Sequence, residues 1–314
     1  MLSFAVRRLV QTVVVLLGVT LVVFVLIHLV PGDPVKLALG TRYDRGTYLA
    51  LRHRAGLDRS LPVQYVTYLA HAVTGDLGVS FRSGLPVTST VAGRLPATIS
   101  LAVSAVVIAL ALAFPLGVLA GMRSGSIFDH GVRVFSQVGV SVPDFWMGIL
   151  AILLFTGVLK WLPPSGYVPL TQSPGQWLQH VIMPAAVVGL VTASILTRFI
   201  RSAVLETLSQ DFVRTADAKG LPRRTVLLRH VLRNALIPVV TVVAVQVASL
   251  LGGVIVVEVL FAWPGVGLLT YDAVQARDYP VLQGAVLFVA ALFLLVNLVV
   301  DLLYGVLDPR ISVR

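Results

Sequence analysis

The sequence contains no cysteine and few charged residues for its length. Of its 314 residues none is Cys, and Asp, Glu, Lys and Arg together make up 12%. The absence of Cys excludes disulfides, thiolate catalysis and zinc sites built on Cys ligands. Soluble domains carry about 25% charged residues. A chain with half that share, and with 57% hydrophobic residues, is expected to face lipid over much of its surface.

Motifs for nucleotide hydrolysis and for metal binding are also missing. No Gly-Lys dipeptide occurs, which excludes a P-loop. The six histidines are scattered along the chain without the spacing of metal ligands. We therefore expect no enzymatic activity, no cofactor and no metal site in this chain. The formal charge of +10 fits contact with an anionic membrane surface.

Long uncharged runs are the main feature that the sequence does have. A membrane span needs about 20 apolar residues, and six runs are candidates: 9–30, 96–121, 134–159, 181–197, 235–257 and 279–300. The third run is interrupted by Pro143 and Asp144, and the fourth is expected to stop at Arg198 and Arg201. The first run is too long for a signal peptide and lacks a small-residue cleavage site, so it is interpreted as a retained anchor.

The distribution of basic residues predicts the orientation of these spans. The short segments assigned to the cytoplasm carry most of the Arg residues, whereas the short outer segments hold only Lys160 and Arg277. Cytoplasmic loops are the ones enriched in Lys and Arg. The prediction places both termini and Arg223 in the cytoplasm, and Tyr65 and Trp177 outside.

The connection 31–95 is long enough to form a subdomain of its own. Its basic residues say little about orientation, because long loops cross membranes largely regardless of charge. Pro62 shortly after Ser60 resembles a capped helix start. The predicted organisation is therefore a first helix in 1–30, an external segment in 31–95 and a five-helix core in 96–314.

One cytoplasmic connection has the features of a folded element. Segment 198–233 contains eight basic and three acidic residues, with apolar residues at helical spacing on both sides of Gly220. Gly past one helix end and Pro222 near the next helix start predict a helix, a tight turn and a second helix. Such a pair could rest on anionic headgroups or dock a cytoplasmic partner. A nucleic-acid role is disfavoured because no aromatics are interleaved with the basic residues.

Short motifs recur along nearly the whole chain and resemble those of one transporter family. The cytoplasmic run 211–221 reads DFVRTADAKGL and is followed by Arg229-His230 and by RNALIP at 233–238. The other motifs are Pro31-Gly32-Asp33-Pro34, GDLG at 75–78 with Ser80-Phe81, RLPAT at 94–98, LPPSG at 162–166, Glu258 with WPG at 263–265, RDYP at 277–280 and DPR at 308–310. Together they resemble the permeases of ABC importers, and most closely the first permease of the dipeptide, oligopeptide and nickel group.

This resemblance implies a fold, partners and a location. The fold is all-α, with six transmembrane helices and a long external insertion after the first helix. The implied partners are a second homologous permease, two ATPase subunits that bind ATP and Mg²⁺, an extracytoplasmic substrate-binding protein and the lipid bilayer. The implied location is the bacterial inner membrane. The implied activity is import of short peptides or related solutes.

The resemblance also assigns the coupling role to loop 201–234. The residues expected to contact the ATPase are Arg214, Thr215, Ala216, Asp217, Lys219, Gly220, Leu221, Arg223 and Arg224. One departure concerns the start of this motif, where the general importer pattern has Glu-Ala-Ala and this chain has Arg-Thr-Ala. A second departure is Arg233, which stands where the pattern has Pro. The first departure puts in doubt any role that the missing Glu carries.

Polar residues within the apolar runs are candidates for the pathway or its gate. A charge near the bilayer centre costs about 2.5–3.5 kcal/mol on insertion scales, which draws attention to Asp144 and Glu258. Asp144 equally fits the cytoplasmic edge of its run, and Glu258 fits an outer-interface cap. Gln246 and Asn297 are further candidates, although both also fit as interhelical hydrogen-bond partners.

Two residues of the external segment and one alternative function complete the predictions. Gly32 and Asp33 follow the first run directly and are expected to form a family signature on the outer side. The alternative function is a secondary transporter driven by an ion gradient. Such carriers show internal repeats and broken helices, and no convincing repeat is found in this sequence.

Overall fold

The computed structural model describes residues 2–40 and 43–307. Helices dominate this part of the chain, which contains no strand, and Val79 and Pro86 form an isolated antiparallel bridge. The chain divides into two units. Unit 1 comprises Met1–Ile99 and Ala262–Arg314, and unit 2 comprises Ser100–Phe261. The all-α fold expected from the sequence is thereby confirmed.

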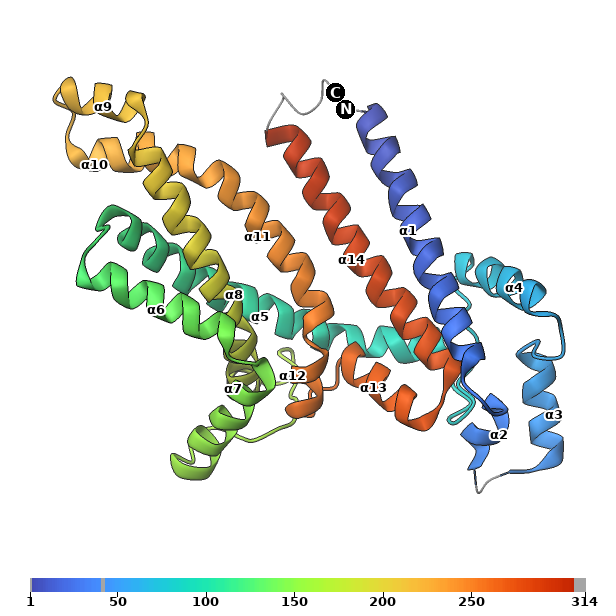
Figure 1. The fold of residues 1–314 in the computed structure, drawn as a ribbon. Helices are drawn as coiled ribbons and strands as arrows, with labels where there is room; N and C mark the ends of the chain where they lie inside the picture. Colours follow the sequence, from blue (N-terminus) through green and yellow to red (C-terminus); the bar gives the residue numbers. More distant parts are fainter. Residues whose placement is uncertain (1, 41–42, 308–314) are drawn as a thin grey trace. The chain divides into compact units, whose positions relative to one another are not determined.

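Unit 1 contains two long apolar helices and a group of short ones from the segment predicted to be external (Figure 1). Its helices are α1 (Leu2–Leu29), α2 (Pro34–Leu39), α3 (Arg45–Arg54), α4 (Leu61–Val73), the start of α5 (Val87–Met122), α13 (Val266–Ala276) and α14 (Tyr279–Leu307). Helices α1 and α14 lie side by side and run in opposite directions. Many large apolar side chains of α1 are exposed, as expected for a helix that faces lipid.

The core of unit 1 is formed where α5, α13 and α14 meet. Val87 and Val91 pack there against Val266, Val281 and Ala285, all at most 4% exposed. A smaller cluster in the external segment holds together α2, α3 and the loop that precedes α5; its buried members are Val35, Tyr48 and Phe81. The predicted external segment 31–95 therefore has an apolar centre of its own within this unit.

Unit 2 contains the remaining helices and the predicted cytoplasmic segment. Its elements are the rest of α5, α6 (Ile127–Ser141), α7 (Asp144–Ala151), the π-helix η2 (Ile152–Val158), α8 (Pro174–Leu208), α9 (Asp211–Ala218), α10 (Arg223–Thr225), the π-helix η3 (Val226–Leu232), α11 (Arg233–Gly253) and α12 (Ile255–Leu260). Helix α8 lies at the centre, in contact with α6, α7 and α11. The main core cluster of the unit runs along α8 toward α9 and η3.

The candidate spans agree with the sequence in number but not all in shape. Within the described residues, five helices are long and apolar enough to cross a membrane, and a sixth span arises if α6 and α7–η2 are counted together. The two parts of that pair meet at 103°. The break falls at Val142 and Pro143, since Pro supplies no backbone amide to continue the α6 ladder. The predicted third span is thus a bent pair.

The helix that contains the fourth predicted run is longer than the run itself. Helix α8 continues through Arg198 and Arg201 to Leu208. Within this helix Arg201 forms an ion pair with buried Asp129, and Arg198 lies over the ring of Phe199. The fifth predicted run also differs, because the chain leaves helical structure after Gly253 and resumes it in α12.

Candidate functional site

The predicted cytoplasmic segment folds as a helix, a turn and a second helix, as expected. Helix α9 is amphipathic, and it buries Val213 and Ala216 against the core of unit 2 at 3% and 6% exposure. Arg214, Thr215 and Asp217 lie on its exposed face. Ala216 therefore anchors the helix, and its neighbours present a surface to the solvent.

The turn between the two helices depends on Gly220. Its φ is +71°, a left-handed conformation that L side chains adopt only with strain. The Gly220 amide donates to the Asp217 carbonyl at 2.9 Å, and this bond closes the end of α9. Pro222 then caps α10, and its carbonyl accepts from the Thr225 amide at 2.8 Å. The order of Gly followed by Pro thus produces the sharp reversal predicted from the sequence.

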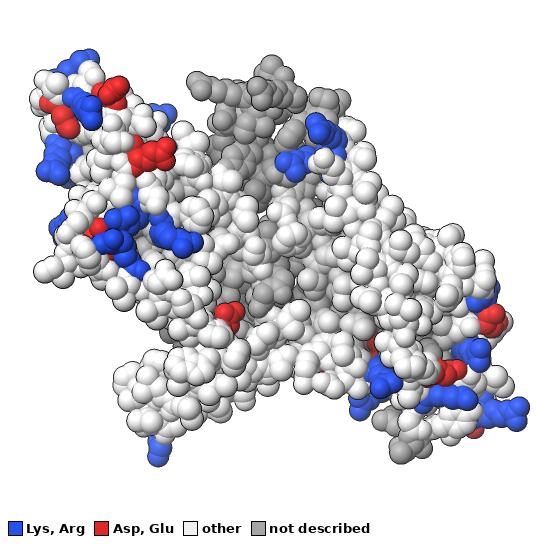
Figure 2. Space-filling model, in the orientation of Figure 1, with Lys and Arg blue, Asp and Glu red and all other residues white. Residues whose placement is uncertain are grey.

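The exposed surface of this segment is basic. Lys219, Arg223 and Arg224 are exposed and form no ion pair within the described part of the chain. Arg214 lies 3.6 Å from Asp211, but both side chains are more than three-quarters exposed, so their pairing contributes little. Figure 2 shows blue side chains at this end of unit 2, with some red ones among them. We call the exposed residues Arg214, Thr215, Asp217, Lys219, Gly220, Leu221, Arg223 and Arg224 the coupling surface.

A buried ion pair supports the helix that leads into the coupling surface. The Asp129 side chain is 1% exposed and accepts two hydrogen bonds from the guanidinium of Arg201, at 2.5 and 2.8 Å. The backbone amide of Gly125 donates to the same carboxylate at 2.9 Å. Arg133 approaches it from the next turn of α6 at 3.9 Å. This pair fastens the start of α6 to α8 seven residues before α8 ends.

The sequence analysis did not single out Asp129, although one signal was available. The Ser126 hydroxyl accepts from the Asp129 amide at 3.1 Å, and the spacing Ser-x-x-Asp is that of a capping box. That pattern predicts the helix start. It does not predict the bond to Arg201, because 72 residues separate the two side chains in the chain.

Three of the four pathway candidates lie in unit 2, in different surroundings. Asp144 is half-buried in the first turn of α7, directly after the break at Pro143, where an acidic side chain favours a helix start. Glu258 is fully buried in α12. Gln246 is half-buried on α11, in a narrow crevice that Thr192 also lines. A role for these residues in the pathway stays a prediction.

The fourth candidate, Asn297, belongs to α14 of unit 1. Its side-chain amide donates to the Phe293 carbonyl one turn earlier, at 3.0 Å. The donor is therefore engaged within its own helix rather than across a helix interface. A role for Asn297 in the pathway also stays a prediction.

The external signature residues act on local structure. Gly32 has a φ of +117°, and Asp33 caps α2 by accepting from the amides of Val35 and Lys36 at 3.0 and 3.1 Å. The Tyr48 hydroxyl donates to the other Asp33 oxygen at 2.7 Å. Burial alone would raise the pKa of Asp33, but these hydrogen bonds outweigh it and hold that pKa below its usual value.

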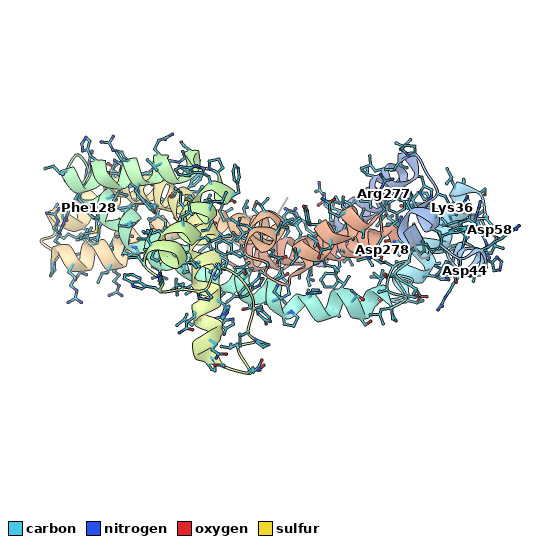
Figure 3. All side chains as sticks on the ribbon, turned by 90° about the horizontal axis from the view of Figure 1, so that it is seen from below. Lys36, Asp44, Asp58, Phe128, Arg277 and Asp278 are labelled. Carbon is cyan, nitrogen blue, oxygen red and sulfur yellow. The ribbon has the colours of Figure 1, made fainter. Side chains whose placement is uncertain are left out.

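Other motifs that are far apart in the sequence meet within unit 1. The carboxylate of Asp278, 4% exposed, accepts from the Ser80 hydroxyl and, at 3.1 Å, from the Phe81 amide. The indole nitrogen of Trp263 donates to the Ala97 carbonyl at 2.8 Å. Arg277 and Asp278 lie at the same end of the unit as Lys36 and Asp58 of the external segment (Figures 1 and 3). These motifs therefore hold the fold together.

No group of three or more His, Asp or Glu side chains in the described ranges is arranged to hold a metal ion.

Comparison with known proteins gives matches along almost the entire chain. The family described as "Binding-protein-dependent transport system inner membrane component" matches residues 113–313. The family described as "Binding-prot-dependent transport system membrane comp, N-term" matches residues 1–102. These two matches include every element described above except a short stretch of α5.

The relatives that match this chain over nearly its full length are named as peptide permeases. The chain is 42% identical to the dipeptide transport system permease protein DppB of Escherichia coli (strain K12), over 99% of each chain. It is 42% identical to the di/tripeptide transport system permease protein DppB of Pseudomonas aeruginosa (strain UCBPP-PA14), again over 99% of each. The identity is also 42% to a putative peptide transport system permease protein of Brucella abortus (strain 2308), at the same coverage.

A solved structure shares the fold at low sequence identity. The structure is that of an amino acid ABC transporter with histidines, and it superposes with a TM-score of 0.53 at 14% identity. The match covers 71% of this chain and 94% of that one. This likeness shows the fold alone. The family match and the named relatives support an ABC importer over a transporter driven by an ion gradient.

Proposed function

The chain belongs to the family of binding-protein-dependent transport system inner membrane components, and on that premise we propose that it forms half of the membrane pathway of an ATP-driven importer of short peptides. The names of relatives that match it from end to end support peptides as the solute class. We infer multi-pass insertion in the inner membrane with both termini in the cytoplasm.

The proposal rests mainly on the geometry of the coupling surface. Val213, Ala216 and Val226 anchor the segment in the core of unit 2, while basic side chains and the Gly220 turn face outward. A pair of helices that only lay on lipid headgroups would be expected to direct its apolar residues toward the membrane. Here Val213, Ala216 and Val226 pack within the protein. The surface that remains combines the basic side chains with the exposed Phe212, Leu221 and Leu228, a mixture suited to a protein partner that offers both acidic and apolar groups.

We propose two ATPase subunits, a second homologous permease and a substrate-binding protein as partners. An ATPase subunit would take up the Gly220 turn, and a second homologous permease would present the same element to a second ATPase subunit. ATP and Mg²⁺ would bind in those ATPase chains, because this chain contains no P-loop. A substrate-binding protein would deliver the peptide from outside.

In this mechanism the chain moves as rigid elements. Closure of the ATPase pair on ATP would displace α9 and α10, and the anchored side chains would pass the displacement to α8 and η3. Switching of this kind needs two packed arrangements and a ligand that favours one of them. The Asp129–Arg201 pair would carry the movement of α8 to α6.

The test uses Gly220→Val in the purified complex with its ATPases and binding protein. A β-branched residue at positive φ is strained by about 1–3 kcal/mol, so the reversal between α9 and α10 should be distorted. We expect substrate-stimulated ATP hydrolysis to fall at least tenfold while the permease remains inserted. The matched control is Gly84→Val, which introduces the same strain at the same φ of +71° in an external turn.

Charge at the coupling surface provides the second arm of this test. Arg224→Glu should release the ATPase more readily than Arg224→Gln, because like charges at a contact repel. Retention of the ATPase on an affinity-purified permease measures this difference. Full ATPase stimulation in the Gly220→Val complex, with normal retention, would contradict the proposal.

A further inference from the structure

Three arginines of unit 2 lie at the ends of apolar runs. Arg133 directly precedes the run 134–159, and Arg198 and Arg201 follow the run 181–197. Apolar runs of a membrane protein lie in the hydrocarbon layer, so residues at their ends are at the level of the lipid headgroups. At this level an Arg side chain can meet the phosphate group of a lipid.

Asp129 holds two of these arginines close together. Its buried carboxylate accepts two hydrogen bonds from Arg201 and lies 3.9 Å from Arg133. Arg201 thereby neutralises Asp129, and the positive charge of Arg133 is left over. The side chain of Arg201 is 18% exposed and that of Arg133 is 50% exposed, so Arg133 is the partner that a ligand can reach.

Arg198 is turned to the same side of this helix pair as Arg133. Helices α6 and α8 run in opposite directions, because the ion pair joins the start of α6 to the end of α8, and a Cβ atom added at Gly139, late in α6, would meet the side chain of Ser194, earlier in α8. Arg133 follows the acidic partner by four residues, and Arg198 precedes the basic partner by three. Both steps turn a helix position in the same sense, by about 40–60°. On antiparallel helices that face each other, the same sense leads to the same flank.

This flank combines positive charge with apolar surface. Arg198 is exposed and forms no ion pair with the residues that the structure describes, and its guanidinium lies 5.9 Å from the ring centre of Phe199. The apolar side chains beside the two arginines are also exposed: Phe199 by 43%, Val134 by 61% and Val138, one turn further along α6, by 54%. Guanidinium groups bind phosphate through two parallel hydrogen bonds. The surface thus suits a ligand that has a phosphate group and an apolar part.

We propose that Arg133 and Arg198 bind the phosphate of an anionic phospholipid, whose acyl chains lie along α6. The bound phosphate bridges α6 and α8 at the level where Asp129 and Arg201 already fasten them. An acidic groove of an ATPase is the other partner that this charge could meet. Lipid is favoured because the apolar side chains that follow Arg133 belong to a candidate membrane span, where lipid is the neighbour. The proposal does not depend on which solute is transported.

The test measures how tightly the purified complex of permease and ATPases retains phosphatidylglycerol in native mass spectra. The complex is delipidated in detergent and titrated with phosphatidylglycerol or with phosphatidylcholine of the same acyl chains. The double variant Arg133→Gln/Arg198→Gln should bind phosphatidylglycerol at least tenfold more weakly, since each Arg near an anionic lipid strengthens binding about fivefold. Both side chains are exposed, and the pair of Asp129 and Arg201 stays intact, so the variant should fold. Phosphatidylglycerol should raise the apparent melting temperature of the wild type more than that of the variant.

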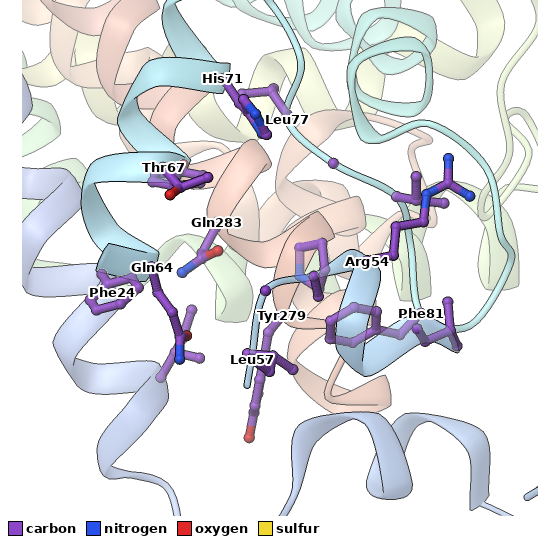
Figure 4. A pocket seen from close by; sticks show the side chains of 18 of the residues that line it. Phe24, Arg54, Leu57, Gln64, Thr67, His71, Leu77, Phe81, Tyr279 and Gln283 are labelled. Carbon is purple, nitrogen blue, oxygen red and sulfur yellow. The ribbon is translucent and has the colours of Figure 1, made fainter. Parts of the chain in front are cut away.

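The matched control is Arg54→Gln/Arg59→Gln, which also removes two positive charges. Both arginines are exposed and line a cavity in unit 1, where Figure 4 shows Arg54. This control should leave the retention of phosphatidylglycerol unchanged. Equal affinity of the wild type for the two lipids, or equal affinity of the wild type and the Arg133→Gln/Arg198→Gln variant for phosphatidylglycerol, would overturn the inference. Displacement of phosphatidylglycerol by inorganic phosphate would also overturn it, because the site would then be one for free phosphate. If the variant loses the ATPases but keeps the lipid, the two arginines belong to the ATPase contact and the inference is wrong.

Discussion

At the scale of single residues, Asp129 and Arg201 are unequal partners. The Asp129 side chain is 1% exposed, whereas that of Arg201 is 18% exposed. If Asp129 is removed, the long Arg201 side chain can turn its charge toward water. If Arg201 is removed, the carboxylate stays buried, and Arg133, at 3.9 Å, is the remaining cation within ion-pair distance among the described residues.

This asymmetry leads to a prediction about three variants. Arg201→Ala should lower the apparent melting temperature of the complex most, because an unpaired buried charge costs about 3–5 kcal/mol. Asp129→Ala should cost less, and the double variant should be more stable than Arg201→Ala alone. Thermal unfolding in detergent, followed by tryptophan fluorescence, measures the order of stability of the three variants.

The control for these variants is Arg214→Ala, whose partner Asp211 is exposed, and we expect a change within about 0.5 kcal/mol. A double variant that is less stable than either single one would show that the two residues contribute independently.

The sequence predicts some residues of the candidate site well and misses others, for a physical reason. The Gly220 turn is predictable because its conformation depends on its immediate neighbours. The burial of Ala216 and the partner of Asp129 are not, because both depend on helices distant in the chain.

At the scale of elements, unit 2 depends on the close approach of α5 to α8. A Cβ atom added at Gly117 would lie 2.7 Å from the Cβ of Ile200 and 2.9 Å from the Thr197 carbonyl. One added at Gly121 would lie 2.8 Å from Val204. The two glycines are four residues apart, the spacing by which small residues let membrane helices pack closely.

We therefore predict that Gly117→Ala destabilises the complex by about 1–3 kcal/mol, since α5 and α8 would have to separate. Gly131→Ala is the matched control, because nothing lies within 4 Å of the added Cβ. Gly131 lies within α6, where Ala favours the helix by up to about 1 kcal/mol, so this variant should be neutral or stabilising. The measurement is the apparent melting temperature of each variant. An equal decrease of that temperature in Gly117→Ala and Gly131→Ala would contradict the prediction.

The elements also show where hydropathy alone is insufficient. It located α1, α5 and α14, whose apolar runs are unbroken. It ends the fourth run at residue 197 although α8 continues to Leu208, because a charged residue interrupts an apolar run but does not end a helix. It could not give the angle at Pro143, which results from packing after the ladder is broken.

At the scale of the whole molecule, the question is whether the bent pair of α6 and α7–η2 crosses the membrane. The start of α6 is fastened to α8 near the coupling surface, through Asp129 and Arg201. The loop after η2 is fastened elsewhere, since the Gly166 amide donates to the Phe261 carbonyl at 3.2 Å. Phe261 follows α12, at the end of unit 2 that α11 reaches on leaving η3 (Figure 1). The bent pair thus runs from one end of unit 2 to the other.

This path predicts six crossings, with the coupling surface and both termini in the cytoplasm. The chain has no Cys, so single Cys residues can be introduced at exposed positions. Val73→Cys and Trp161→Cys, at side chains 89% and 68% exposed, should react with a membrane-impermeant maleimide in intact cells. Arg7→Cys and Arg223→Cys should react only after permeabilisation. A re-entrant pair would keep position 161 inside and would place the coupling surface outside, beyond the reach of any ATPase. Labelling of position 223 from outside would therefore overturn both the topology and the proposed docking, whereas labelling of position 161 from outside requires the pair to span.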